Sequence, residues 1–210
     1  MRLRAIVAAW AWATFLSAPG FAQQQPAPPV AAAADLKFAL AEVATAFEKQ
    51  TGQAVKLTFG SSGNFATQLE QGAPFQLYFS ADEAYVQRLA AKGLTRDDGT
   101  VYAVGRIVLF APHGSPLTVD AQLGDLKAGL ADGRVRRFAI ANPEHAPYGR
   151  RAMEALQRAG IWDAIRPKLV MGENIAQTAQ FATTGGSQGP PFFLRAPPTV
   201  LAVNRRRKSP

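Results

Sequence analysis

The sequence predicts an α/β fold, and two features along most of the chain favour this class. Short apolar runs alternate with amphipathic stretches, which is typical of strands joined by crossover helices. Three of the apolar runs are followed by the same local design, a short loop of small or polar residues and then a helix. These three loops, at 31–36, 59–64 and 141–149, hold the residues with the clearest chemical potential.

Element boundaries in the first half of the chain follow from turn residues and from the hydrophobic period. Leu36, Leu40, Val43 and Phe47 recur at helical spacing, and Gly52 just beyond them is a typical helix stop. The elements expected in this half are strands at 30–33, 55–59 and 77–79, and helices at 35–51, from the loop at 61–64 through residue 70, and around 86–90.

The second half begins with the apolar run Tyr102–Ala111, in which we interpret Val104–Phe110 as one long strand where the chain passes into a second lobe. Apolar and amphipathic stretches then continue to alternate, without internal repeats. The elements expected here are helices at 123–130, 149–159 and 175–181, and strands at 137–141 and 168–171.

The character of the sequence changes near its end. From Asn174 to Pro210 there is no Asp or Glu, and the Gly- and Pro-rich runs at 185–191 and 196–198 argue against regular structure. An abrupt loss of acidic residues favours a changed reading frame or an unrelated fused end over a natural basic tail. The predicted organisation is a signal peptide at 1–22, lobe one at 23–104, lobe two at 105–185 and an irregular basic tail at 186–210.

The first 22 residues have the three parts of a secretory signal. Arg2 and Arg4 form the positive start, Ala5–Leu16 is an apolar run, and Gly20–Ala22 is a small-x-small cleavage site. The apolar run is shorter than the roughly 20 residues that a membrane-spanning helix needs. The sequence therefore predicts export to the periplasm with cleavage near Ala22.

Charge and cysteine content exclude several function classes. The formal net charge is +8, but two basic residues lie in the signal and five in the last 16 residues, so 16 basic residues in the body face all 15 acidic ones. A nearly neutral body lacks the electrostatic footprint of a nucleic-acid-binding protein. The absence of cysteine excludes disulfides, thiolate metal sites and cysteine nucleophiles.

The three strand-to-helix loops predict an anion site. A helix N-terminus offers unpaired backbone N–H groups and the positive end of the helix dipole. The hydroxyls of Ser61 and Ser62 would add donors, while Gly60 and Gly63 would let the backbone come close to a ligand. The alternative is that the serines only cap their helix, as Ser often does at this position.

Enzymatic interpretations have less support. The only two histidines are 32 residues apart and neither has a ligand-spaced partner, so we expect no metal site. A serine hydrolase would need Ser61 or Ser62 as nucleophile, with His145 and either Glu144 or Asp82 as its partners. The spacing of the G-x-S-x-G nucleophile elbow is not met, so a non-enzymatic binding protein is favoured.

Taken together, these motifs resemble the periplasmic molybdate-binding proteins of ABC importers. The likeness covers residues 30–184 in family order. The matching stretches are Ala32–Leu36, Phe59–Gly63, Gln68–Pro74, Phe79–Asp82, Asn142–Gly149 and Glu173–Ile175.

The resemblance implies a type II periplasmic binding protein fold, in which two lobes with mixed sheets flanked by helices close over a ligand. The implied function is capture of molybdate or tungstate for delivery to the membrane permease of an ABC importer, by a monomer without cofactor or nucleic acid. Another small anion such as sulfate, a periplasmic serine hydrolase, and an inactive truncated product remain as alternatives. The closing strand and helices of the family are not recognisable after Gly185, which implies a fold incomplete at its C-terminus.

The family pattern also implies site residues. Ser62 takes the role of the second-loop serine beside Ser61, Tyr148 lies at the Pro-x-Gly position, and Ile175 offers its N–H from the later turn. Where the first-loop serine is expected, this chain has Asp35, or Ala34 if one residue is inserted. A carboxylate facing an anion is repulsive, by about 1 kcal/mol at 4 Å even in water, so Asp35 is expected to cap its own helix and point away.

Overall fold

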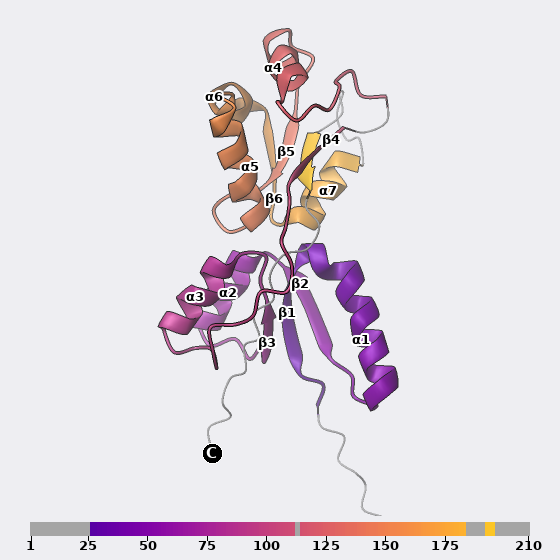
Figure 1. The fold of residues 1–210 in the computed structure, drawn as a ribbon, viewed down its shortest axis with the longest axis vertical. Helices are drawn as coiled ribbons and strands as arrows, with labels where there is room; N and C mark the ends of the chain where they lie inside the picture. The colour runs from indigo at the N-terminus through magenta and orange to yellow at the C-terminus, as the bar shows by residue number, and fades with distance from the viewer. Residues whose placement is uncertain (1–25, 112–113, 184–191, 196–210) are drawn as a thin grey trace, which may run out of the picture.

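Two α/β lobes make up the described part of the protein, each built around its own sheet (Figure 1). The computed structural model describes residues 26–111, 114–183 and 192–195. The predicted signal peptide at 1–22 lies outside these residues, as does most of the predicted tail. Within the described ranges, no helix combines the length and the apolar character that a membrane crossing requires.

Lobe one has a three-stranded parallel sheet with strand order β2-β1-β3. The central strand is almost entirely Ala and Val and is buried, as expected for a parallel strand covered on both faces. Figure 1 shows α2 and α3 on one side of this sheet and α1 on the other. The elements are β1 (Pro29–Ala33), a 3-10 turn η1 (Ala34–Leu36), α1 (Lys37–Thr51), β2 (Lys56–Gly60), α2 (Ser62–Glu70), β3 (Leu77–Phe79) and α3 (Glu83–Ala91).

The core of lobe one lies between the sheet and helices α2 and α3. Leu69, Tyr78 and Leu89 are fully buried there, together with Phe65. Each such side chain contributes roughly 1.5–3 kcal/mol through removal from water. The Tyr78 hydroxyl donates to the carbonyl of Ser62 at 2.7 Å, so the core also fixes the start of α2.

Lobe two has a four-stranded mixed sheet with strand order β4-β7-β5-β6. Its main core packs Phe138 and Ile140 of β5 against Leu156 of α5, Leu126 of α4 and Ile165 of α6. Figure 1 shows α5 and α7 on opposite sides of the sheet. The elements are β4 (Val108–Phe110), α4 (Gly124–Ala131), β5 (Phe138–Ala141), α5 (Pro147–Arg158), α6 (Trp162–Ile165), a 3-10 turn η2 (Arg166–Lys168), β6 (Leu169–Gly172), α7 (Ile175–Thr183) and β7 (Phe192–Arg195).

Most predicted elements are confirmed within a few residues, and so are the residues that end α1 and begin α5. Gly52 ends α1 in the left-handed conformation, with φ 70°, and Pro147 occupies the first turn of α5. The predicted helix at 35–51 differs only in its first turn, which is the 3-10 turn η1. Because η1 follows β1 directly, the loop that should contact a ligand is very short.

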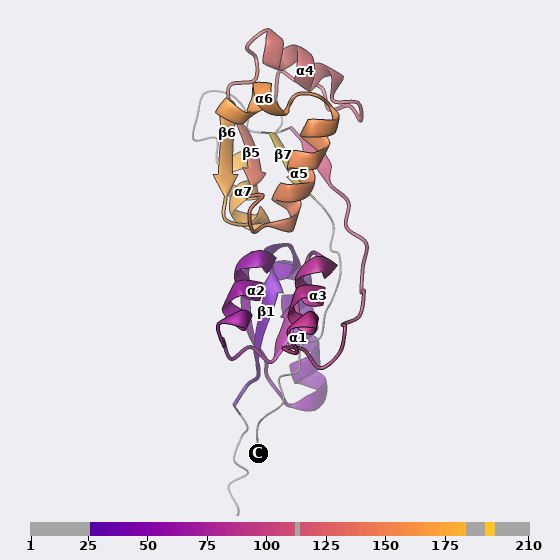
Figure 2. The same ribbon diagram turned by 90° about the vertical axis from the view of Figure 1, so that its left-hand side faces the viewer.

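The long strand predicted at 104–110 is confirmed only over its last three residues. Only Val108–Phe110 forms a strand, and the residues before it run along the outside of the molecule between the lobes (Figure 2). The side chains of Val101 and Val104 there are 58% and 78% exposed. An apolar run without a neighbouring strand cannot complete a ladder of hydrogen bonds, so composition alone gave the wrong prediction.

The tail predicted to be irregular at 186–210 contains a strand. Strand β7 (Phe192–Arg195) lies between β4, to which it is antiparallel, and β5, to which it is parallel. The run Phe-Phe-Leu has high strand propensity, and two neighbouring strands supply the hydrogen-bond partners that a four-residue segment cannot supply for itself. The other residues of the predicted tail lie outside the described ranges.

Candidate functional site

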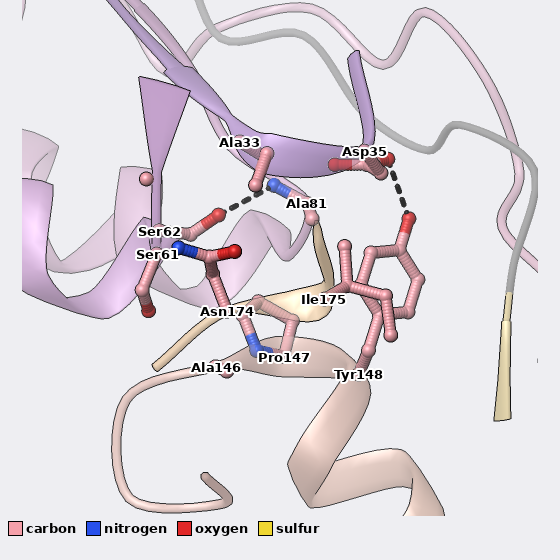
Figure 3. Close-up of a pocket in the computed structure, with 12 residues that line it drawn as sticks. Ala33, Asp35, Ser61, Ser62, Ala81, Ala146, Pro147, Tyr148, Asn174 and Ile175 are labelled. Atoms are coloured by element: carbon pink, nitrogen blue, oxygen red, sulfur yellow. Dashed lines mark hydrogen bonds between the residues drawn. The ribbon is translucent and has the colours of Figure 1, made fainter. Parts of the chain in front are cut away.

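A cavity lies where the two lobes meet, and its walls come from the ends of strands and the starts of helices (Figure 3). Lobe one contributes the turns after β1, β2 and β3, and lobe two contributes the N-terminal ends of α5 and α7. All six residues predicted from the sequence lie in its lining: Ala34, Asp35, Ser61, Ser62, Tyr148 and Ile175. The structure adds Ala33, Gly60, Ala81, Ala146, Pro147 and Asn174.

Ser62 is the first residue of α2 and its side chain is held in one orientation. Its Oγ accepts a hydrogen bond from the N–H of Ala81 at 3.0 Å, and only 1% of the residue is exposed. Among the described residues no acceptor is recorded for the Ser62 hydroxyl proton, so this proton is available to a ligand in the cavity. The Tyr78 hydroxyl donates to the carbonyl of Ser62 and so holds the backbone at this position.

Ser61 joins the two lobes and does not cap α2 with its side chain. Its Oγ donates to the carbonyl of His145, and no side-chain capping bond is formed at this N-cap position. The capping interpretation of Ser61 is therefore wrong. The ring nitrogen Nδ1 of His145 lies 3.1 Å from the same Oγ. Because the single hydroxyl proton points to the carbonyl, Nδ1 faces an oxygen lone pair and does not act as a base toward Ser61.

The acids proposed for a hydrolase do not contact His145. Asp82 caps α3 and lies 3.6 Å from Arg151, and no bond between Glu144 and the imidazole is recorded. The carboxylate near His145 Nε2 is instead Glu173, at 3.4 Å. In this arrangement His145 joins lobe two to Ser61 of lobe one and has Glu173 beside its other ring nitrogen.

Asp35 faces the cavity, contrary to the expectation that it points away. Its Oδ2 accepts a hydrogen bond from the hydroxyl of Tyr148 at 2.7 Å, and its Oδ1 is buried with no hydrogen-bond partner among the described residues (Figure 3). Burial raises the pKa of Asp35 above its ordinary value, and the Tyr148 hydrogen bond opposes this only in part. The expectation failed because Tyr148 reaches Asp35 from the other lobe, 113 residues further along the chain.

The N-terminus of α7 is capped in a way that leaves its first amide at the cavity. Asn174 Oδ1 accepts from the N–H groups of Ala176 and Gln177 at 3.0 and 3.1 Å. The preceding amide, that of Ile175, is not part of this cap and lies in the cavity lining. The apolar side chain of Ile175 packs against Ala34, which fixes the position of its backbone.

Helix N-termini, and no cationic side chain among the described residues, surround the cavity. Helices α2, α5 and α7 all begin at it, so three positive helix ends converge there. No Lys or Arg is found among the described residues that line it. The nearby Arg150 is engaged elsewhere, because it donates to the Tyr85 hydroxyl at 2.9 Å and lies over the Tyr85 ring.

Four residues around this site were given no individual role from the sequence. Asn174, Glu173 and Ala81 lie in stretches that resemble the family, and Asn174 also carries a recognisable N-cap signal. The contacts of Glu173 and Ala81 are tertiary and have no local signature. Tyr102 precedes the predicted strand; its hydroxyl is buried near Asp35 and its ring packs edge-on against Phe79.

Comparison with known proteins agrees with this geometry. The model of the bacterial extracellular solute-binding protein family matches residues 29–190. The molybdate-binding protein ModA of Rhodobacter capsulatus is 38% identical over 159 residues, which cover 75% of this chain and 60% of that protein. ModA of Azotobacter vinelandii is 38% identical over 160 residues, 76% of this chain and 61% of that protein. The chain thus spans about 60% of the length of these curated relatives.

Solved structures show the same fold. The periplasmic molybdate-binding protein of Azotobacter vinelandii matches with a TM-score of 0.69 at 25% identity, over 84% of this chain and 85% of that one. A tungstate ABC transporter protein of Geobacter sulfurreducens matches with a TM-score of 0.62 at 15% identity, over 85% and 84%. With its two lobes and a family match over residues 29–190, the chain belongs to the bacterial extracellular solute-binding protein family.

Proposed function

We propose that this chain captures molybdate, or its analogue tungstate, outside the cytoplasm and delivers it to the permease of an ABC importer. The observation that carries the proposal is the Ser62 hydroxyl, whose oxygen is occupied by the Ala81 N–H and whose proton is free for an acceptor. A fully ionised oxyanion offers only acceptors, which suits a cavity of neutral donors and helix N-termini. The names of the relatives with 38% identity support this choice of anion.

The protein would act as a non-enzymatic monomer, exported by the signal peptide at 1–22 and active without a cofactor. Closure of two lobes over the anion would be a hinge motion, and release would require the lobes to separate. Neutral donors favour such release because they hold the anion without forming ion pairs. Sulfate and phosphate are the nearest competing ligands, since they have the same tetrahedral arrangement of acceptors.

Isothermal titration calorimetry with molybdate, tungstate, sulfate and phosphate tests the proposal. We expect molybdate and tungstate to bind more tightly than sulfate. Replacing Ser62 with Ala should weaken molybdate binding by about 10- to 100-fold, because a hydrogen bond to a charged group contributes roughly 1.5–3 kcal/mol. A chain that binds sulfate as tightly as molybdate, or binds no oxyanion, would contradict the proposal.

Thr45→Ala is a matched control for the loss of a hydroxyl. The Thr45 side chain is exposed on α1 and bonds only to the carbonyl of Ala41 in its own helix, at 2.9 Å. This variant should bind molybdate as the native chain does. A comparable loss in both variants would show that the Ser62 effect is not specific to the cavity.

A further inference from the structure

Only one of the two carboxyl oxygens of Asp35 has a hydrogen-bond partner among the described residues. Asp35 is the sole acidic side chain among the described residues that line the cavity. Its Oδ2 is held by the Tyr148 hydroxyl, while its Oδ1 is buried and has no hydrogen-bond partner in the described part of the chain. Leaving a buried acceptor without a donor costs free energy. Oδ1 would therefore be stabilised by carrying a proton itself or by accepting a hydrogen bond from a ligand.

No positive charge compensates Asp35. The groups that act on its carboxyl are the Tyr148 hydroxyl from α5 and the backbone N–H groups of Asp35 and Leu36. Tyr102, from the segment before β4, lies close enough to feel the Asp35 charge, and its buried hydroxyl has no hydrogen-bond partner among the described residues. None of the ion pairs between described residues includes Asp35, although Lys37 follows it closely. Of the elements packed against η1, α7 has no titratable residue and β2 has only Lys56, at its far end. The remaining charged residues of α1 are Glu42, Glu48 and Lys49.

Tyr102 is a neutral neighbour of Asp35. Burial, together with the Asp35 charge itself, raises the pKa of Tyr102 far above neutrality. Burial likewise raises the pKa of Asp35. Burial, the largest influence, favours the uncharged carboxyl, while the Tyr148 hydroxyl and the backbone N–H groups of Asp35 and Leu36 oppose it only in part. An arriving anion would favour the uncharged form further through its negative charge.

We propose that Asp35 holds the oxyanion as a neutral carboxylic acid that donates a hydrogen bond from Oδ1, so that each captured anion brings one proton with it. The inference rests on the proposed function, because it concerns how that anion is held. A protonated carboxyl has one O–H donor, which converts the unpartnered acceptor into the group that an anion needs. The Tyr148 hydrogen bond leaves Oδ1 as the oxygen that carries this proton.

Proton uptake makes the affinity depend on pH with a definite sign. Below the pKa of Asp35 in the free protein, the site is already protonated and the dissociation constant is constant. Above that pKa, only the protonated fraction is competent, so the apparent dissociation constant rises by about tenfold per pH unit. Binding is therefore strongest in acid and weakens as the pH rises.

Calorimetry of the purified protein with molybdate between pH 5 and pH 8 tests this, in pairs of buffers that differ in ionisation enthalpy. Above the Asp35 pKa, the native chain should take up close to one proton per anion. Asp35→Asn carries a permanent amide donor of the same shape, so its affinity should be independent of pH and its proton uptake should vanish. Asp163→Asn, an acid on α6 away from the cavity, should keep the native proton uptake.

The outcomes separate this inference from the proposed function. Molybdate binding with no proton uptake by the native chain, at a pH above the Asp35 pKa of the free protein, overturns the role of Asp35 and leaves the proposed function standing. Proton uptake that persists in Asp35→Asn also overturns it. Tighter binding of hydrogen phosphate than of molybdate would indicate an ionised Asp35 that accepts from the ligand. Absence of binding by both the native chain and Asp35→Asn at every pH overturns the proposed function itself.

Discussion

Asp35 is a single residue whose protonation should be visible in the stability of the ligand-free protein. Its pKa is raised in the folded state, so the folded chain binds more protons than the unfolded chain between the two pKa values. The stabilisation is therefore complete below the ordinary pKa and is lost as the pH rises through the raised one. Across this interval the free energy of unfolding falls by up to about 1.4 kcal/mol per pH unit relative to a chain without the carboxyl.

Asp35→Asn should accordingly become more stable than the native chain as the pH rises. Its side-chain oxygen can still accept from Tyr148, but it carries no buried charge. Urea unfolding at a series of pH values from 3 to 7 measures the difference between the two free energies. If the difference between the two unfolding free energies stays constant over this range, folding does not raise the pKa of Asp35 and the prediction is contradicted.

At the residue scale, local pattern and the family resemblance together found the cavity lining but did not describe its bonding. The three strand-to-helix loops contain five of the six predicted residues, whereas the resemblance supplied Ile175 and the role of Tyr148. The partners of these residues come from distant parts of the chain: Ser61 bonds to His145, and Asp35 bonds to Tyr148. Such pairs depend on how the lobes meet, and no local spacing encodes that.

Helix α5 is positioned by a glycine at its start. A Cβ on Gly149 would overlap the carbonyl group of Ala141 at the end of β5 and the backbone of Asn142, so only glycine lets the helix lie this close. Gly149→Ala should push α5 away from β5 and destabilise the protein by about 1–3 kcal/mol, as overpacking does. The same displacement moves Tyr148 from Asp35, so molybdate binding should weaken as well.

Gly124→Ala is the matched control for this prediction. Gly124 begins α4, and an added Cβ would meet nothing closer than the Asp120 carboxylate at 3.7 Å, which is an ordinary contact. Alanine is the better helix former, so this variant should be as stable as the native chain or slightly more stable. Urea unfolding of both variants decides the matter, and equal stabilities would contradict the role assigned to Gly149.

At the element scale, the predictions were right where propensity and context agree. The helices have their expected stops, and the buried strands of lobe one are read correctly from their apolar runs. Two predictions differ in part from the structure, a strand over all of 104–110 and irregular structure at 192–195, and they differ for the same reason. A strand exists only where neighbours complete its hydrogen bonds, and β7 has such neighbours while Val104 does not.

The relation between the lobes determines whether the cavity exists at all, and one glycine at their contact offers a test. Gly63 lies in α2 of lobe one, and its N–H donates to the carbonyl of His145 in lobe two at 2.8 Å. A Cβ at this position would overlap His145 and the hydroxyl of Tyr85. Within α2 itself alanine is favourable, so Gly63→Ala should keep lobe one folded while preventing this approach of the lobes.

The expected result for Gly63→Ala is a molybdate affinity reduced by at least about tenfold, with an unfolding free energy that does not fall. A tenfold loss corresponds to a shift of about 1.4 kcal/mol against the closed arrangement. Small-angle scattering should also give a larger radius of gyration in the presence of molybdate than for the native chain. Gly124→Ala, which changes a glycine far from the contact, should leave both quantities unchanged. Native affinity in Gly63→Ala would mean that the anion is held by lobe one alone, and that the Tyr148–Asp35 contact is not needed for capture.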